Sequence, residues 1–150
     1  MAKFYYLNFV EIKEEFYAYG HELIQATHKT TLEITKDNYL TKRGNCIIAI
    51  KSEKACADLR PELKELIKTD GSKVIIKISV NNFEEIIEAD GSSKLILTSS
   101  NSIVIRKSDY IDERTLAIRA NKASVDLDRN FVKNLRSVNS KVKIEITALY

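Results

Sequence analysis

Short runs of alternating apolar and polar residues, separated by turn signals, dominate this chain of 150 residues. The plainest case is residues 73–80 and 83–89, which meet at Asn81-Asn82, a pair suited to the left-handed geometry of a tight hairpin turn. Such alternation is typical of antiparallel strands, because successive side chains point to opposite faces of a strand. Further strands are predicted at residues 4–12, 16–27, 31–36, 45–51, 94–98, 102–106, 115–119 and 142–147.

Two helices interrupt these strands. The first is predicted at residues 59–68, with an apolar stripe formed by Leu59, Leu63, Leu66 and Ile67. The second is predicted at residues 121–136, with Asn121 as its N-cap. It should leave Asp126, Arg129 and Lys133 in water and bury Ala123, Leu127, Phe131 and Leu135. Helices and strands do not alternate regularly, which argues against a doubly wound fold. We expect an α+β fold, mainly antiparallel, as a curved sheet or partial barrel with two helices.

The composition suits one globular domain spanning residues 1–150, since 44% of the residues are hydrophobic and no linker or internal repeat is evident. The net charge of +3 is only mildly basic, although basic residues outnumber acidic ones in the last third. No apolar run approaches the roughly 20 residues that a membrane helix requires. Cys46 and Cys56 show no paired spacing, and neither is expected to be a nucleophile. These features predict a cytoplasmic protein without a membrane partner.

The two histidines of the chain, His21 and His28, lie in a stretch rich in threonine. Imidazole is the side chain most easily recruited for proton transfer, metal binding or phosphate contact. The histidine spacing matches no zinc pattern, so we assign no metal site and no cofactor. Two alternatives remain for each ring, namely a structural hydrogen bond to backbone or carboxylate, or a role in ligand contact or proton transfer.

A second candidate cluster flanks the predicted loop 107–113 and consists of Arg106, Lys107, Ser108, Asp109 and Arg114. Arginines beside hydroxyls and backbone amides can grip a phosphate or carboxylate. The alternative is a local network in which an arginine pairs with Asp109 or Asp112 to hold the loop. Both interpretations are compatible, because a carboxylate often orients the arginine that binds a ligand.

Three segments, residues 20–37, 40–47 and 105–123, together resemble the archaeal domain of unknown function family 371. They include Gly20-His21, Gly44-Asn45-Cys46 and Ser108-Asp109-Tyr110. The resemblance implies an archaeal origin and brings no established activity. The family commonly has an acidic residue where this chain has Asn45, and another where it has Asn121. If those acids take part in chemistry, their absence here weakens an enzymatic function.

Three functions follow as expectations. The leading one is a binding domain for a phosphate-bearing ligand, RNA or a nucleotide, whose charge would be neutralised by Arg106, Lys107 and Arg114. Hydrogen bonds to that ligand would come from His21, His28, Thr30 and Thr31. The second is a small-molecule enzyme in which His28 is the general acid or base, held by Glu33. The third is a homodimer or a non-catalytic subunit of a larger archaeal assembly.

Overall fold

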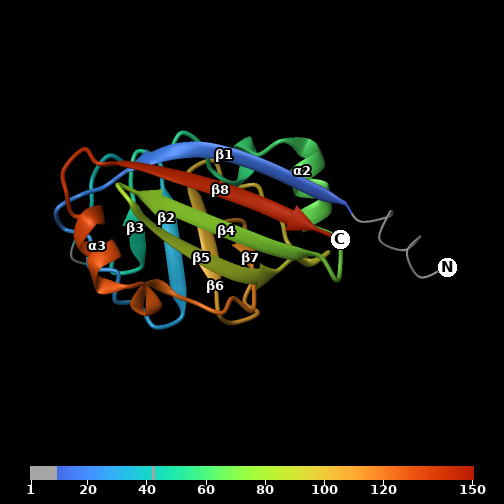
Figure 1. Cartoon of the computed structure of the whole chain (residues 1–150). Helices are drawn as coiled ribbons and strands as arrows, with labels where there is room; N and C mark the ends of the chain where they lie inside the picture. The colour runs from blue at the N-terminus through green and yellow to red at the C-terminus, as the bar shows by residue number, and fades with distance from the viewer. Residues whose placement is uncertain (1–9, 42) are drawn as a thin grey trace.

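The computed structural model describes residues 10–41 and 43–150 and contains two four-stranded sheets (Figure 1). The first sheet is antiparallel and has the strand order β1-β8-β4-β5. Its strands are β1 (Glu11–Tyr19), β8 (Lys141–Leu149), β4 (Lys73–Val80) and β5 (Phe83–Asp90). The second sheet has the order β3-β2-β6-β7, with an antiparallel centre and parallel outer pairs. Its strands are β3 (Ile47–Ala49), β2 (Thr31–Thr35), β6 (Ser102–Arg106) and β7 (Thr115–Ala117).

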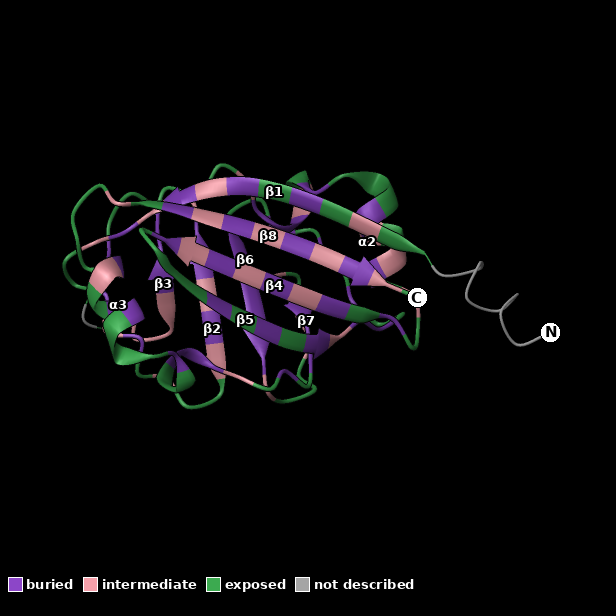
Figure 2. Ribbon diagram, viewed as in Figure 1, coloured by how far each residue is buried: buried purple, intermediate pink, exposed green. Residues whose placement is uncertain are grey.

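The core lies between the two sheets, where the alternation of buried and exposed residues along each strand places the apolar side chains (Figure 2). Ile76 and Ile144 of the first sheet and Leu32 and Ile103 of the second are completely buried. Isolated bridges join the sheets at two corners, one between Tyr19 and Ile50 and one between Asp90 and Ile118. The sheets are therefore partly curled without closing into a barrel, which confirms the expected α+β class.

The helices are α2 (Pro61–Ile67) and α3 (Arg129–Leu135), each preceded by a 3-10 turn, η1 (Cys56–Asp58) or η2 (Ser124–Asp126). Helix α2 packs on β1 and β8, and α3 packs on β3, β4 and β5. Both are shorter than predicted. The N-cap of α3 is Asp128 rather than Asn121, because the Asp128 carboxylate accepts N–H bonds from Asn130 and Phe131 at 2.8 and 3.1 Å. Within the described residues no helix is long and apolar enough to cross a membrane.

The predicted apolar face around α3 is confirmed, since all four of its members are buried: Ala123, Leu127, Phe131 and Leu135. Two predicted strand segments are wrong. Residues 20–27 and 94–98 are loops, because Ala26 and Leu97 take the positive φ angles of 50° and 56°, which break the extended chain. Most of the strand predicted at residues 4–12 lies outside the described residues.

The expectation of no internal repeat is also wrong, because the same series of elements occurs twice. The first copy is β1-β2-β3-η1-α2-β4, and the second is β5-β6-β7-η2-α3-β8. When each strand is replaced by its equivalent in the other copy, the strand order of each sheet is the same read from the opposite edge. An approximate twofold axis therefore passes between β4 and β8 in one sheet and between β2 and β6 in the other.

The equivalence of the two copies extends to single hydrogen bonds. Asp58 accepts the N–H of Ala55 at 2.9 Å, and Asp126 accepts the N–H of Ala123 at 2.8 Å. The same two aspartates pair with lysines at the ends of equivalent strands, Lys36 with Asp58 at 2.6 Å and Lys107 with Asp126 at 2.7 Å. Positions of one copy thus have partners in the other, except for three extra residues between β2 and β3, so each copy serves as a reference for the other.

Candidate functional site

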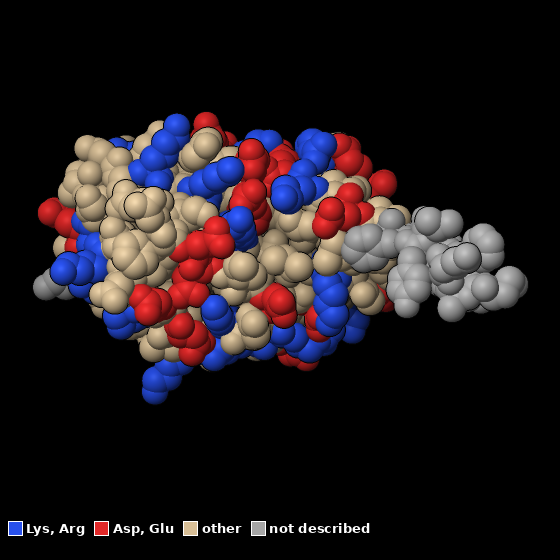
Figure 3. Space-filling model, viewed as in Figure 1, with Lys and Arg blue, Asp and Glu red and all other residues tan. Residues whose placement is uncertain are grey.

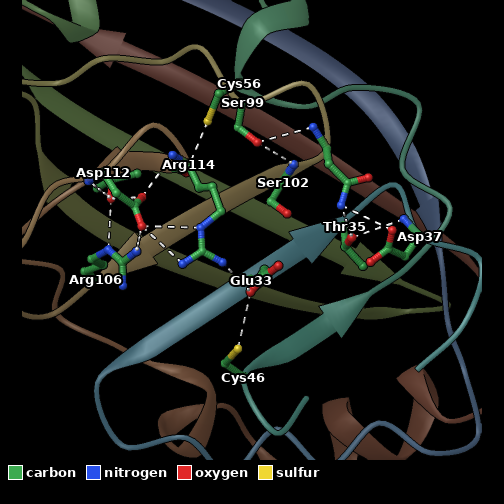
Figure 4. Close-up of polar contacts among 12 residues, drawn as sticks. Glu33, Thr35, Asp37, Cys46, Cys56, Ser99, Ser102, Arg106, Asp112 and Arg114 are labelled. Carbon is green, nitrogen blue, oxygen red and sulfur yellow. Dashed lines mark hydrogen bonds and ion pairs between the residues drawn. The ribbon is translucent and has the colours of Figure 1, made fainter. Parts of the chain in front are cut away.

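A pocket of about 580 Å³ lies over the outer face of the second sheet, the face turned away from the core (Figure 4). Leu32 and Ile34 of β2 point into the core, so Glu33 between them points outward into this pocket. Ser102 does the same from β6. The lining is polar throughout and consists of Glu33, Asp37, Thr98, Ser99, Ser100, Asn101, Ser102, Glu113 and Arg114.

Arg114 provides the positive charge of the pocket. One edge of its guanidinium group is anchored by hydrogen bonds, and the other edge is open to the pocket. Its Nε and Nη2 donate to Oδ2 of Asp112 at 3.3 and 3.1 Å. On the other edge, Nη1 lies 3.9 Å from Oε1 of Glu33. The side chain is 41% exposed. Arg114 is therefore held by Asp112 and presents Nη1 to the pocket beside Glu33.

Behind Arg114, the carboxylate of Asp112 also binds Arg106, whose Nη2 donates to Oδ2 at 3.0 Å. Oδ1 of Asp112 accepts the backbone N–H of Arg114 at 2.9 Å and the hydroxyl of Thr115 at 3.1 Å. Burial alone would raise the pKa of Asp112, but these hydrogen bonds and the charge of Arg106 outweigh it and hold the pKa below its ordinary value of 3.8. Asp112 is therefore charged at neutral pH, and Arg106, only 8% exposed, supports it from behind.

The opposite wall is a turn of consecutive hydroxyl and amide residues, Thr98 to Ser102. The hydroxyl of Ser99 accepts the N–H groups of Asn101 and Ser102 at 3.3 and 3.1 Å. The amide of Asn101 donates to Oδ1 of Asp37 at 3.2 Å. This wall is held by its own hydrogen bonds and offers further hydroxyl groups to the pocket.

The lining carries more negative than positive charge. Three carboxylates, Glu33, Asp37 and Glu113, face one guanidinium, Arg114. That guanidinium is already neutralised by Asp112, which lies behind it. A ligand in this pocket meets carboxylates, hydroxyls and the guanidinium of Arg114, which is already hydrogen-bonded to Asp112 on one edge.

The two thiols near the site are unreactive. Burial, with a smaller contribution from the neighbouring Glu33, raises the pKa of Cys46 to about 12. Burial, with a smaller contribution from Asp112, raises the pKa of Cys56 to about 12. Both thiols are therefore protonated at neutral pH, in line with the expectation that neither is a nucleophile.

Comparison of the two copies shows which residues the fold itself requires and which are particular to the pocket. The N–H of Glu33 donates to the carbonyl of Cys46 at 2.9 Å, and the N–H of Val104 donates to the carbonyl of Arg114 at 2.8 Å. Cys46 thus occupies the place of Arg114, and Val104 the place of Glu33. Each copy thus contributes one charged and one uncharged residue, and the same backbone contact forms with either kind, so the fold does not require the charged pair of Glu33 and Arg114.

The same comparison explains both histidines. Nδ1 of His28 accepts the N–H groups of Thr30 and Thr31 at 3.2 and 3.1 Å, as the hydroxyl of Ser99 does in the other copy. Nδ1 of His21 accepts the N–H of Leu23 at 3.0 Å, as Ser92 does for Lys94 at 3.2 Å. A backbone N–H can only donate, so each Nδ1 is the acceptor in these contacts. The contacts of both rings are those of turn-forming residues, and neither ring lines the pocket.

We expect His28→Ser to change the free energy of unfolding by less than about 0.5 kcal/mol, because serine forms the equivalent turn in the other copy. His28→Ala should lower it by about 1 kcal/mol, the usual cost of removing a side-chain acceptor of backbone N–H groups. Urea denaturation measures both, and Ser99→Ala is the matched variant in the second copy. If serine proved as damaging as alanine, the histidine would have a role beyond the turn.

The structure brings only part of the predicted cluster together. Glu33 and Arg114 line the pocket, and Arg106 supports them through Asp112, as in the alternative of a loop-holding network. Thr31 pairs with Arg106 across β2 and β6, and the carbonyl of Thr30 accepts the N–H of Lys107 at 2.9 Å.

The other predicted residues have different partners. The ammonium of Lys107 is paired with Asp126, and the carbonyl of Ser108 accepts the N–H of Arg119 at 3.0 Å. Asp109 lines a separate cavity. The polar wall of residues 98–102 was missed, although its run of hydroxyl residues was a visible signal.

Among the residues that the structure describes, no group of three or more His, Cys, Asp or Glu side chains is placed to hold a metal ion.

Comparisons with known proteins agree with the resemblance seen in the sequence. The family model for the domain of unknown function DUF371 matches residues 16–149. The uncharacterised protein MJ0206 of the archaeon Methanocaldococcus jannaschii is 46% identical over 119 residues, which cover 79% of this chain and 87% of that protein. The predicted family is thereby confirmed, and the chain belongs to the DUF371 family.

Proposed function

We propose that this chain is a binding domain for a small polar metabolite, held in the pocket over β2 and β6. The observation that supports this most is that the charged pair, Glu33 of the first copy with Arg114 of the second, has no charged counterpart at the equivalent places of the repeat. Cys46 and Val104 fill the equivalent places of Arg114 and Glu33 without loss of the backbone contacts. A partly buried and hydrogen-bonded set of charges that the fold can do without is best accounted for by a ligand.

The charge of the lining narrows the class of ligand. Three carboxylates would repel a phosphate, and the single guanidinium among them is already paired with Asp112. Hydroxyl or ammonium groups would instead donate to Glu33, Asp37 and Glu113, while an oxygen of the ligand accepts from Nη1 of Arg114. We therefore favour a ligand with several hydroxyl or amine groups, such as an amino sugar, over the phosphate-bearing ligand expected from the sequence.

Nucleic acid is also a weaker candidate. Proteins that bind RNA gather Lys and Arg on one face, because most of the affinity comes from phosphate contacts. On the outer face of the first sheet, lysines are interspersed with glutamates, and Lys77 pairs with both Glu84 and Glu145 (Figure 3). This mixed face offers no continuous basic stripe. The polar pocket remains the best candidate for a binding site.

The test is a ligand titration followed by NMR, with glucosamine, a polyol and a polyamine in one series. Inorganic phosphate, AMP and total RNA form the second series. Glu33→Gln should weaken binding of a first-series ligand about 10-fold or more, since a hydrogen bond to a charged group contributes about 1.5–3 kcal/mol. The matched control is Glu22→Gln, which removes the same charge from an exposed loop residue outside the pocket.

Thermal unfolding of each variant checks that the fold is intact. Binding restricted to the second series, and weakening steeply with salt, would overturn this proposal in favour of a phosphate-bearing ligand. Equal loss of affinity in Glu33→Gln and Glu22→Gln would place the ligand elsewhere.

A further inference from the structure

A second cavity of about 300 Å³ lies at the corner where the bridge between Asp90 and Ile118 joins the two sheets. Two isoleucines, Ile111 and Ile118, contribute apolar surface to it. Four charged side chains, two of each sign, complete its rim: Asp70, Lys94, Asp109 and Arg119. This cavity is separate from the pocket over β2 and β6, with which it shares no lining residue.

Two of the charged groups are held in place by neighbours outside the cavity. Asp70 accepts the N–H and the hydroxyl of Ser93 at 2.7 and 3.0 Å. Nε of Arg119 donates to Asp90 at 2.9 Å, which leaves both Nη groups of the guanidinium without a hydrogen bond to the described residues. Within the same part of the chain, the side chains of Lys94 and Asp109 form no hydrogen bond or ion pair. The charges of the rim therefore do not neutralise one another through contacts.

The other copy of the repeat supplies the reference for this cavity. Lys51 and Arg119 occupy equivalent places, since both have a φ near 50° and donate their N–H to equivalent carbonyls, those of Asp37 and Ser108. Leu23 is equivalent to Lys94, because each donates its N–H to the side chain two residues before it. Counting along the chain from these pairs makes Val138 the equivalent of Asp70, and Asn38 the equivalent of Asp109.

The isoleucines of the cavity have apolar equivalents in the first copy, Leu40 and Ile50, both of them buried. The fold therefore keeps the apolar surface in both copies but needs only one charge on the rim, that of Lys51 or Arg119. The other three charges, those of Asp70, Lys94 and Asp109, have uncharged equivalents: Val138, Leu23 and Asn38. All four charged side chains of the rim are exposed to water, so solvent compensates them in the free protein, and a ligand that enters the cavity meets both signs of charge.

We propose that this cavity is a second binding site, which takes a zwitterionic ligand with an ammonium and a carboxylate group. The ammonium lies between Asp70 and Asp109, and the carboxylate accepts from the free Nη groups of Arg119 and from Lys94. The apolar part of the ligand packs on Ile111 and Ile118. A ligand with a single charge is repelled by the two rim residues of its own sign, whereas a zwitterion places an opposite charge beside both the acidic and the basic pair.

NMR titration of the labelled full chain with L-leucine and with 4-aminobutyrate tests the proposal, with butylamine and butyrate as probes of one charge each. The expected result is saturable shifts around the cavity for at least one zwitterion. Either single-charge probe should bind at least about 10-fold more weakly, the effect of about 1.4 kcal/mol. Absence of saturable shifts at roughly 10 mM, ten times a Kd of about 1 mM, would overturn the proposal.

Two variants locate the ligand. Arg119→Ala should weaken binding at least about 10-fold, and the matched control Lys51→Ala, at the equivalent place of the other copy, should not. Asp109→Asn places there the amide that Asn38 has in the other copy; it breaks no contact and should weaken binding similarly. Equal loss in Arg119→Ala and Lys51→Ala contradicts the proposal. Loss in Glu33→Gln instead would assign the zwitterion to the pocket over β2 and β6 and leave this cavity without a ligand.

Discussion

Replacing Phe131 by alanine is expected to lower the free energy of unfolding by about 3–5 kcal/mol, the usual cost of truncating a buried aromatic side chain. Phe131 is 1% exposed and lies on the face of α3 that packs on β3, β4 and β5. The loss combines the apolar surface returned to water with the cavity left behind. Since small domains are stable by about 5–15 kcal/mol, this variant should be close to unfolding.

The free energy of unfolding is measured by urea denaturation followed by far-UV circular dichroism, because the chain contains no tryptophan for fluorescence detection. Lys133→Ala, on the exposed side of the same helix, should change it by less than about 0.5 kcal/mol. Leu63→Ala in α2 is the variant at the equivalent place of the other copy and should cost about 2–5 kcal/mol. A loss below about 1 kcal/mol for Phe131→Ala would show that α3 presents another face to the core.

Asp112→Ala is expected to lower the free energy of unfolding by about 3–5 kcal/mol, because it leaves the buried guanidinium of Arg106 without its partner. It also removes the acceptor of the Arg114 side chain and of the Thr115 hydroxyl. Asp109→Ala, in the same loop but without a contact among the described residues, should be nearly neutral. The equivalent place of Asp112 in the other copy is Gly44.

The effect of Asp112→Ala should depend on pH. The folded state holds the pKa of Asp112 below its ordinary value of 3.8, so the carboxylate stabilises the fold fully above that value. The stabilisation is lost as the pH falls through the lower pKa of the folded state. The difference between the wild type and Asp112→Ala should therefore be constant from pH 5 to 7, on the order of the full loss, and should narrow below about pH 4. A difference that stayed constant into acid would mean that the carboxylate is not the stabilising group.

The internal repeat was visible in the sequence, although only as a weak signal. The pattern Lys-Ala-x-x-Asp-Leu occurs at residues 54–59 and again at residues 122–127. Each occurrence builds a 3-10 turn whose aspartate accepts the N–H of the alanine. Outside such short stretches the copies share the pattern of burial more than the residues themselves, and that pattern is common to many strands.

The members of the candidate binding pocket could be identified only from the tertiary structure. Glu33, Arg114 and Asn101 come from distant parts of the chain and meet only because β2 pairs with β6 and β7 lies beside β6. The histidine stretch stood out in the sequence because histidine is rare in this chain. In the other copy, serines accept the equivalent hydrogen bonds, so the rarity of histidine in the sequence did not indicate a chemical role.

Local periodicity alone determined the hairpin of β4 and β5, the buried face around α3 and the α+β class. These properties depend on neighbours within a few residues, so the order of side chains along the chain encodes them directly. The ends of the helices, the twofold arrangement and the members of the pocket were decided by contacts between distant segments. Such contacts depend on strand pairing and on backbone turns such as those at Ala26 and Leu97, which short-range patterns do not specify.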